Sequence, residues 1–215
     1  MIFSRIFSKK RQDTTGFVDR DMIEILMNGV FSFTMTLIVK NIPLPTVADI
    51  ANPDIIVNFF ERTMYDGISF IFTFLILALF WLFVFEVHRG IKFVEPGVVL
   101  IEFVLLLTIV LIPISSIYLN YSDDVPVFST AFHLNVLVSG LLVLILALYT
   151  LHRKVLHDPD ISYLSRQRLA IRASIIPIAA VFGLFQAFFE FQVIDDLIVY
   201  LVAAVIIAIL AKKYP

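Results

Sequence analysis

The sequence contains no cysteine, which excludes disulfides, thiolate catalysis and cysteine-ligated metal sites. Charged residues are scarce as well, at 16% of the chain, whereas 60% of the residues are hydrophobic and 22 of them are phenylalanine. An average soluble domain is about half apolar and about one quarter charged. A soluble domain of 215 residues cannot bury so much apolar surface. The composition therefore indicates an integral membrane protein.

Regular alternation of polar and apolar residues, the pattern of transmembrane β-strands, is absent from the hydrophobic runs. Several runs approach or exceed the ~20 residues with which an α-helix crosses a bilayer. We therefore predict an all-α, polytopic membrane protein with six transmembrane helices. One membrane domain over 22–215 follows a polar, charged segment, 1–21, in which no cleaved signal peptide is visible. The predicted spans are 22–42, 66–88, 97–119, 129–151, 172–190 and 193–211.

Common motifs of enzymes are also missing from the sequence. It has no ordered Ser-His-Asp set, HExxH pair, Walker loop or Rossmann fingerprint, and no cluster with metal-ligand spacing. We predict a protein that is not an enzyme, uses no cofactor or metal, and does not bind nucleic acid.

Prolines mark the predicted connections. Pro113 and Pro177 instead lie inside predicted spans, where we expect them to kink the helices, as membrane bundles tolerate. The prolines in connections, where they cannot disturb a helix interior, are Pro43, Pro45, Pro53, Pro96, Pro126 and Pro159.

Lysine and arginine are distributed unevenly. All but Lys40 and Arg62 lie in the N-terminal segment, the connection 89–97, the linker 152–172 or the C-terminus. Cytoplasmic loops are enriched in basic residues, so we predict that both termini are cytoplasmic. We interpret the basic residues of the linker 152–172 as part of this orientation signal. The alternative is that they bind lipid headgroups. The opposite side is acidic, with Asp49, Asp54, Glu61, Asp66, Asp123, Asp124, Asp195 and Asp196.

A polar stripe runs along the first predicted span with four-residue spacing, which keeps its members near one face of a helix. Two interpretations compete. The stripe packs against a neighbouring helix through hydroxyl and amide bonds, or it lines a water-filled path along a symmetry axis. Its last member, Lys40, either snorkels to the outer interface or lies over the mouth of the path. The stripe is Asn28, Ser32, Thr36 and Lys40, and the adjacent positions are Gly29, Phe33 and Leu37.

Four segments, in order along the predicted helices, resemble motifs of one known family, the endolysosomal potassium channels with their bacterial and archaeal homologues. These channels have six-helix units and lack the TVGYG filter. The segments are 28-NGVFS-32 with 36-TLIV-39, then 73-TF-74 with Trp81, then 105-LLLTIVLIPISS-116, and finally 156-LHDPDI-161.

The resemblance implies that the first helices of four assembled subunits line the pore. Bulky apolar side chains would constrict it at Phe33 and then at Leu37, with Ser32 and Thr36 as the polar lining beside them. Gly29 and Trp81 would contribute to helix packing near the pore. A third apolar layer of the family falls on Lys40, where this chain differs.

The chain departs from the family's Arg-x-x-x-Phe-Ser-Asp motif, which would occupy residues 22–28, and from its paired histidines after the tryptophan. Val84 and Phe85 occupy the histidine positions, His88 follows one turn later, and Arg20 is out of register at an unsuitable angle. Only Trp81 and an amide, Asn28, remain of this network. Either packing replaced the charged network, which can be energetically neutral, or the fold persisted and conduction was lost.

These observations predict a filterless potassium or cation channel, assembled as a homotetramer in the lipid bilayer of the plasma membrane and passing potassium or other monovalent ions. The alternative is a non-conducting or anion-tolerant relative that acts as a membrane sensor or scaffold. A secondary transporter would need inverted repeats and broken helices. We predict local roles for four other polar residues. Glu24, Glu86 and Glu102 are interfacial or paired. His133 makes a satisfied polar contact or senses pH.

Overall fold

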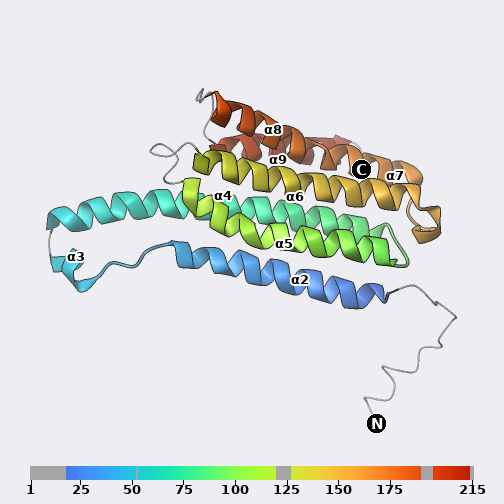
Figure 1. Cartoon of the computed structure of the whole chain (residues 1–215), viewed down its shortest axis with the longest axis horizontal. Helices are drawn as coiled ribbons and strands as arrows, with labels where there is room; N and C mark the ends of the chain where they lie inside the picture. Colours follow the sequence, from blue (N-terminus) through green and yellow to red (C-terminus); the bar gives the residue numbers. More distant parts are fainter. Residues whose placement is uncertain (1–17, 52, 120–126, 190–195, 214–215) are drawn as a thin grey trace, which may run out of the picture.

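The computed structural model describes residues 18–51, 53–119, 127–189 and 196–213, which form a bundle of roughly parallel and antiparallel helices (Figure 1). Within these residues β pairing is limited to two isolated bridges, Val18–Val94 and Ile91–His157. The predicted all-α class is confirmed. The helices are α2 (Arg20–Leu37), η1 (Ile38–Asn41), α3 (Val47–Ala51), α4 (Pro53–Arg89), α5 (Pro96–Leu119), α6 (Val127–His152), η2 (Lys154–Leu156), α7 (Tyr163–Ala173), α8 (Ile175–Phe188) and α9 (Asp196–Lys213).

Five segments among the described residues are long and apolar enough to cross a membrane. They are Arg20–Lys40, Ile55–Arg89, Pro96–Leu119, Val127–His152 and Tyr163–Phe188. The chain is thus a multi-pass membrane protein. Helix α9 has 18 residues and ends in Lys212 and Lys213. That α9 crosses the membrane as a sixth span therefore stays a prediction.

Helix α4 is longer than the second predicted span. It begins at Pro53 rather than at residue 66, so most of the region expected to be a proline-rich connection is helical. Proline suits the first position of a helix, because its missing N–H has no intrahelical partner there. At 1.5 Å per residue the 37 residues span about 55 Å, against about 30 Å for a hydrocarbon core. Figure 1 shows the first turns of α4, next to α3, extending past the ends of α5 and α6.

The linker predicted at 152–172 also contains more helix than expected. Helix α7 covers Tyr163–Ala173 and is separated from α8 by Ser174 alone. Pro177 is the third residue of α8, in the first turn, where proline removes no intrahelical hydrogen bond. Pro113, in contrast, lies within the continuous helix α5.

The two ends of the bundle differ in charge. The start of α2, the turn from α4 to α5, the end of α6, α7 and the end of α9 lie at one end (Figure 1), which we call the basic end. The bridges between residues 18 and 94 and between 91 and 157 tie three of these segments together. The opposite, acidic end holds Asp49, Glu61 and Asp66, whereas the acidic residues Asp123, Asp124 and Asp195 and the basic residues before position 18 lie outside the described residues. The basic end holds Arg20, Arg89, Lys92, Arg153, Lys154, Arg166, Arg168, Arg172, Lys212 and Lys213.

Candidate functional site

Helix α2 begins with an N-cap at Asp19, whose carboxylate accepts a hydrogen bond from the backbone N–H of Asp21 at 3.0 Å. Such caps satisfy one of the free N–H groups at the start of a helix. The helix then presents one face to α4 and α5 and leaves the other uncovered by the described chain. The buried face consists of Ile23, Met27, Phe31 and Thr34, followed by Ile38 in η1.

The uncovered face of α2 contains the residues that the sequence placed at the pore. Phe33 is 62% exposed, and only Leu37 among these residues is half-buried. No atom outside the helix backbone and its immediate neighbours would lie within 4 Å of a methyl group at Gly29. A close helix contact at Gly29 therefore has to come from another molecule and stays a prediction. The exposed members are Asn28, Gly29, Ser32, Phe33, Thr36 and Lys40; we call them, with Leu37, the α2 face.

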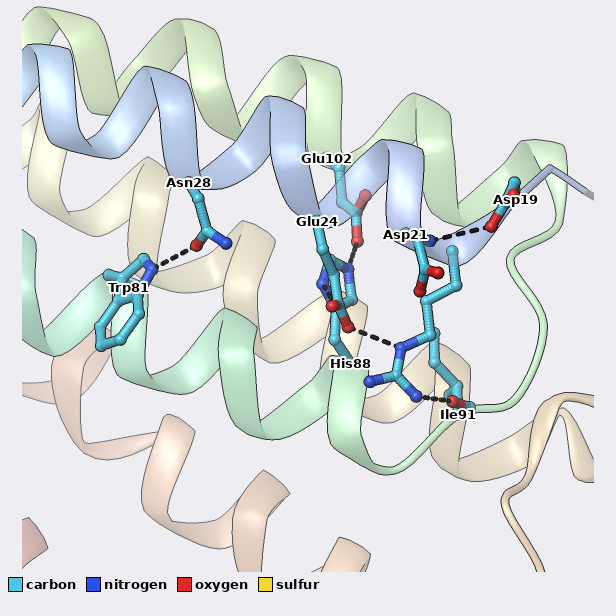
Figure 2. Close-up of polar contacts among 9 residues, drawn as sticks. Asp19, Asp21, Glu24, Asn28, Trp81, His88, Ile91 and Glu102 are labelled. Carbon is cyan, nitrogen blue, oxygen red and sulfur yellow. Dashed lines mark hydrogen bonds and ion pairs between the residues drawn. The ribbon is translucent and has the colours of Figure 1, made fainter. Parts of the chain in front are cut away.

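Local hydrogen bonds satisfy part of this polar stripe. The hydroxyl of Thr36 donates to the carbonyl of Phe33 at 2.8 Å, a bond within the helix that hydroxyl side chains commonly make. Asn28 is bound differently, because its side-chain oxygen accepts a hydrogen bond from the indole N–H of Trp81 on α4 at 2.8 Å (Figure 2). Trp81 in turn stacks on Phe85, with ring centroids 5.5 Å apart.

One turn closer to the basic end, a second polar contact joins three helices. His88 on α4 and Glu102 on α5 are each 2% exposed, and His88 Nε2 lies 2.5 Å from Glu102 Oε1. On the other side of the ring, His88 Nδ1 lies 4.0 Å from Glu24 Oε1 of α2. Glu24 also accepts a hydrogen bond of 2.6 Å from Arg20 Nε. Figure 2 shows these side chains converging between α2, α4 and α5.

Arg20 completes this ion-pair network with a contact beyond α4, since its Nη1 donates to the carbonyl of Ile91 at 3.1 Å. Helices α2 and α4 run antiparallel, so their contacts progress in opposite directions along the chain: Asn28 meets Trp81, Glu24 meets His88, and Arg20 meets Ile91. Polar and charged side chains therefore join α2, α4 and α5 at this level, and Arg20 takes part in these contacts.

The electrostatics of this network centre on His88. Its ring lies between two carboxylates: Nε2 is within hydrogen-bond distance of Glu102, whereas Nδ1, 4.0 Å from Glu24, is beyond that distance. The second oxygen of Glu102, Oε2, is buried without a hydrogen-bond partner among the described residues, so its carboxylate depends on His88. No group of three or more His, Asp or Glu among the described residues is arranged to hold a metal ion.

The remaining glutamates that the sequence singled out are paired as well. Glu86 on α4 accepts from Arg172 Nη2 of α7 at 2.9 Å. The prediction of paired roles for Glu24, Glu86 and Glu102 is confirmed.

Glu95, which no motif in the sequence marks, precedes α5 and accepts hydrogen bonds from Arg153 at 2.9 and 3.0 Å and from the Tyr149 hydroxyl. The bonds from Arg153, and then that from Tyr149, hold the pKa of the Glu95 carboxyl below its usual value. This group fastens the turn between α4 and α5 to the end of α6.

Most of the contacts described above involve α2, α4 and α5, and the match to a known family covers the same part of the chain. Residues 22–113 match the endosomal/lysosomal potassium channel family TMEM175. The predicted resemblance is confirmed. The TMEM175 match contains the α2 face, Trp81 and the network from Glu24 to Glu102, whereas the predicted motif 156–161 lies beyond it. A comparison with curated protein sequences found no match.

Beyond the TMEM175 match, polar side chains of α6 make two further contacts with other helices. His133 is fully buried in α6, and its Nδ1 lies 2.6 Å from the hydroxyl of Tyr200 on α9. The amide nitrogen of Asn135 and the hydroxyl of Ser115 on α5 are 3.2 Å apart. The prediction of a satisfied polar contact for His133 is confirmed, and the role in pH sensing stays a prediction.

Proposed function

We propose that this chain forms a filterless potassium channel whose pore is lined by the α2 face of four subunits. The observation that supports the proposal is that residues spaced as a polar stripe all lie on the side of α2 that the chain itself leaves uncovered. Hydrocarbon solvates amide and hydroxyl groups poorly. A shared axis where four copies of α2 meet would give this stripe water and would cover Phe33, which is 62% exposed in the single chain.

The proposed gate is a hydrophobic constriction at Phe33, with Leu37 one turn further along. A narrow ring of apolar side chains blocks ions by excluding water, and pores of this kind open when the ring widens. Ser32 and Thr36, next to these positions, would offer hydroxyl groups to ions on either side of the constriction. The Asn28–Trp81 hydrogen bond and the Glu24–His88–Glu102 contacts would hold α2 at a defined rotation against α4 and α5.

Lys40 favours a second candidate function. It is exposed at the end of the α2 face, in η1. In a tetramer, an ammonium ~10 Å from a passing cation repels it by roughly 1–2 kcal/mol at an effective dielectric of about 20, and four such groups oppose potassium entry. Rings of lysine favour anions. A non-conducting or anion-tolerant membrane sensor or scaffold is therefore the alternative.

We propose that the basic end lies in the cytoplasm, because basic residues are retained on that side of a membrane. Both termini would then be cytoplasmic, and the chain would cross the membrane six times. The plasma membrane is the proposed location, although the matching family is described as endosomal/lysosomal. The bilayer and monovalent ions are the proposed partners.

Ion flux in proteoliposomes tests the proposal under a potassium gradient and then a chloride gradient. We expect the wild type to pass potassium and Phe33→Ala to pass more. Phe103→Ala is the matched control, because Phe103 on α5 is also exposed, at 54%, but lies off α2. Lys40→Leu should raise cation flux if the lysines face the path. Silence of all variants to both ions would reject the channel and favour the scaffold.

The assembly can be tested without conduction, because the chain has no native cysteine. Ser32→Cys should form disulfide-linked subunits under mild oxidation if α2 lies at the axis. Phe103→Cys should not. Equal cross-linking of the two variants would reject the axis.

A further inference from the structure

Two cavities adjoin at the basic end, one on each side of α7. The first, of about 430 Å³, lies between the end of α4 and α7. The second, of about 240 Å³, lies between α7 and α9. Arg172 borders both cavities. The two cavities therefore form a continuous surface around one side chain.

The first cavity has an excess of positive charge. Three arginines line it, Arg89, Arg166 and Arg172, against two carboxylates, Glu86 and Asp160. Glu86 is already neutralised by Arg172 at 2.9 Å. Arg89 is exposed, and its side chain makes no hydrogen bond or ion pair with the described part of the chain. Its guanidinium is available to an anion.

Arg166 adds to this charge from within the protein. It is 8% exposed, and its Nε donates to the carbonyl of Gly90 at 3.1 Å, while Nη2 donates to the carbonyl of Asp158. Both acceptors are uncharged. The cavity also contains the hydroxyls of Ser162 and Ser165, 2.9 Å apart, which can donate to phosphate oxygens.

The second cavity is apolar apart from its rim. Ile171 and Leu210 line it together with Arg168 and Arg172. Arginine side chains cover apolar surface with their stems while the charged heads reach water. This second cavity is an apolar groove that leads from the arginine side chains to Ile171 and Leu210. Ile171 lies in the segment Tyr163–Phe188, which is apolar enough to enter a membrane.

We propose that these cavities bind an anionic glycerophospholipid, with its phosphate against Arg89 and the hydroxyls of Ser162 and Ser165 and one acyl chain along Ile171 and Leu210. Basic pockets between membrane helices on the cytoplasmic side suit such headgroups. Free phosphate would leave the apolar groove empty, which is why the lipid is the occupant favoured by the structure. A bound lipid would bridge α4 and α7 from outside, beside the Glu86–Arg172 ion pair. This site does not depend on whether the chain conducts ions.

Native mass spectrometry of the full chain in detergent tests the site, with phosphatidylglycerol and phosphatidylcholine added at equal concentration. We expect preferential retention of phosphatidylglycerol. Arg89→Gln should lower that retention about five-fold, which is the typical effect of one basic residue near an anionic headgroup. Lys92→Gln is the matched control, because Lys92 is an exposed cation of the same end that lines neither cavity.

Two further experiments distinguish binding of the whole lipid from binding of its headgroup alone. Ile171→Ser should weaken retention of phosphatidylglycerol, and soluble glycerol 3-phosphate should fail to displace the lipid. Equal retention of the two lipids, an equal loss in Lys92→Gln and Arg89→Gln, or displacement by glycerol 3-phosphate at the lipid's own concentration would each overturn the proposal. Both arginine and lysine variants alter exposed side chains, and an unchanged elution volume confirms that they fold.

Discussion

Helices α2 and α6 are held in the bundle in different ways. Helix α6 packs against α5, α7 and α8 and lies in the interior of the bundle (Figure 1), whereas α2 lies at its edge with one face uncovered. A buried polar contact of α6 joins His133 to the hydroxyl of Tyr200 on α9. The polar contacts of α2 include the ion-pair network through Glu24 and His88. Helix α6 is positioned largely by its packing against three neighbouring helices, although one stripe that includes Leu134 and Ile145 stays exposed. A helix at the edge, such as α2, needs directional contacts to define its rotation.

The largest effect is expected where the ion-pair network is cut. His88→Leu leaves Glu102, 2% exposed, without its hydrogen-bond partner. Removing one partner of a buried pair costs about 3–5 kcal/mol, because the other charge stays buried without compensation. Denaturation in detergent should show this loss of unfolding free energy.

The double variant His88→Leu/Glu102→Leu is the control for that experiment. It removes both buried polar groups, so most of the lost stability should return. A double variant as unstable as the single one would show that shape, not charge, holds α4 against α5.

A smaller loss of stability is expected where α6 packs against α8. A methyl group at Gly183 on α8 would lie 2.3 Å from the ring atoms Cε1 and Nδ1 of His133. That ring is fully buried and bonded to Tyr200, so it cannot easily move. Overpacking of this kind costs about 1–3 kcal/mol, and thermal melting of Gly183→Ala should show it.

Gly67→Ala is the matched control, because a methyl group at Gly67 in α4 would meet nothing within 4 Å. We expect it to be neutral or slightly stabilising, as alanine is a better helix former than glycine. If the two alanine variants melted alike, close packing between α6 and α8 would not explain how α6 is held.

The third prediction concerns the turn that connects the two parts of the molecule. Because the pKa of Glu95 is lowered in the folded chain, its bonds to Arg153 and Tyr149 contribute full stability above pH 4.5, the usual value for this carboxyl. The contribution is lost as the pH falls further, through the lower folded pKa. The difference in melting temperature between wild type and Glu95→Gln should therefore shrink below pH 4.5. We expect a small effect, since the Arg153 side chain is 53% exposed.

Arg153→Gln should reproduce the pH dependence of Glu95→Gln. Lys154→Gln should not, because Lys154 is an exposed neighbour that does not bond to Glu95. A pH-independent difference for Glu95→Gln would show that the carboxylate charge contributes nothing.

The smallest effect on subunit stability is expected on the α2 face. Gly29→Ala adds a methyl group that meets nothing within 4 Å among the described residues, so the monomer should lose no stability. If copies of α2 approach each other there, the same variant should change cross-linking at Ser32→Cys. A loss of monomer stability would mean that this face is already packed within the subunit.

Much of the fold followed from patterns that are local in sequence. The hydrophobic runs predicted the long helices, and the four-residue spacing from Asn28 to Lys40 predicted that these residues share a face. Local patterns were misleading at the start of α4. The prolines of the segment 41–62 predict a connection there, yet proline is acceptable at a first helical position and α4 begins at Pro53.

The ion-pair network could not be predicted from each helix by itself. Glu24 lies on α2, His88 on α4 and Glu102 on α5, so these residues are far apart in the chain. Only the packing of α2 and α5 against α4 brings their side chains together.

By itself the sequence determined that this is a helical membrane protein with one basic end and a polar stripe on its first helix, because composition and helical periodicity depend only on neighbours along the chain. The tertiary structure decided that the stripe is left uncovered and that Glu24, His88 and Glu102 meet. Both outcomes depend on how α2 is rotated against α4 and α5, and that rotation is set by contacts between residues far apart in the chain.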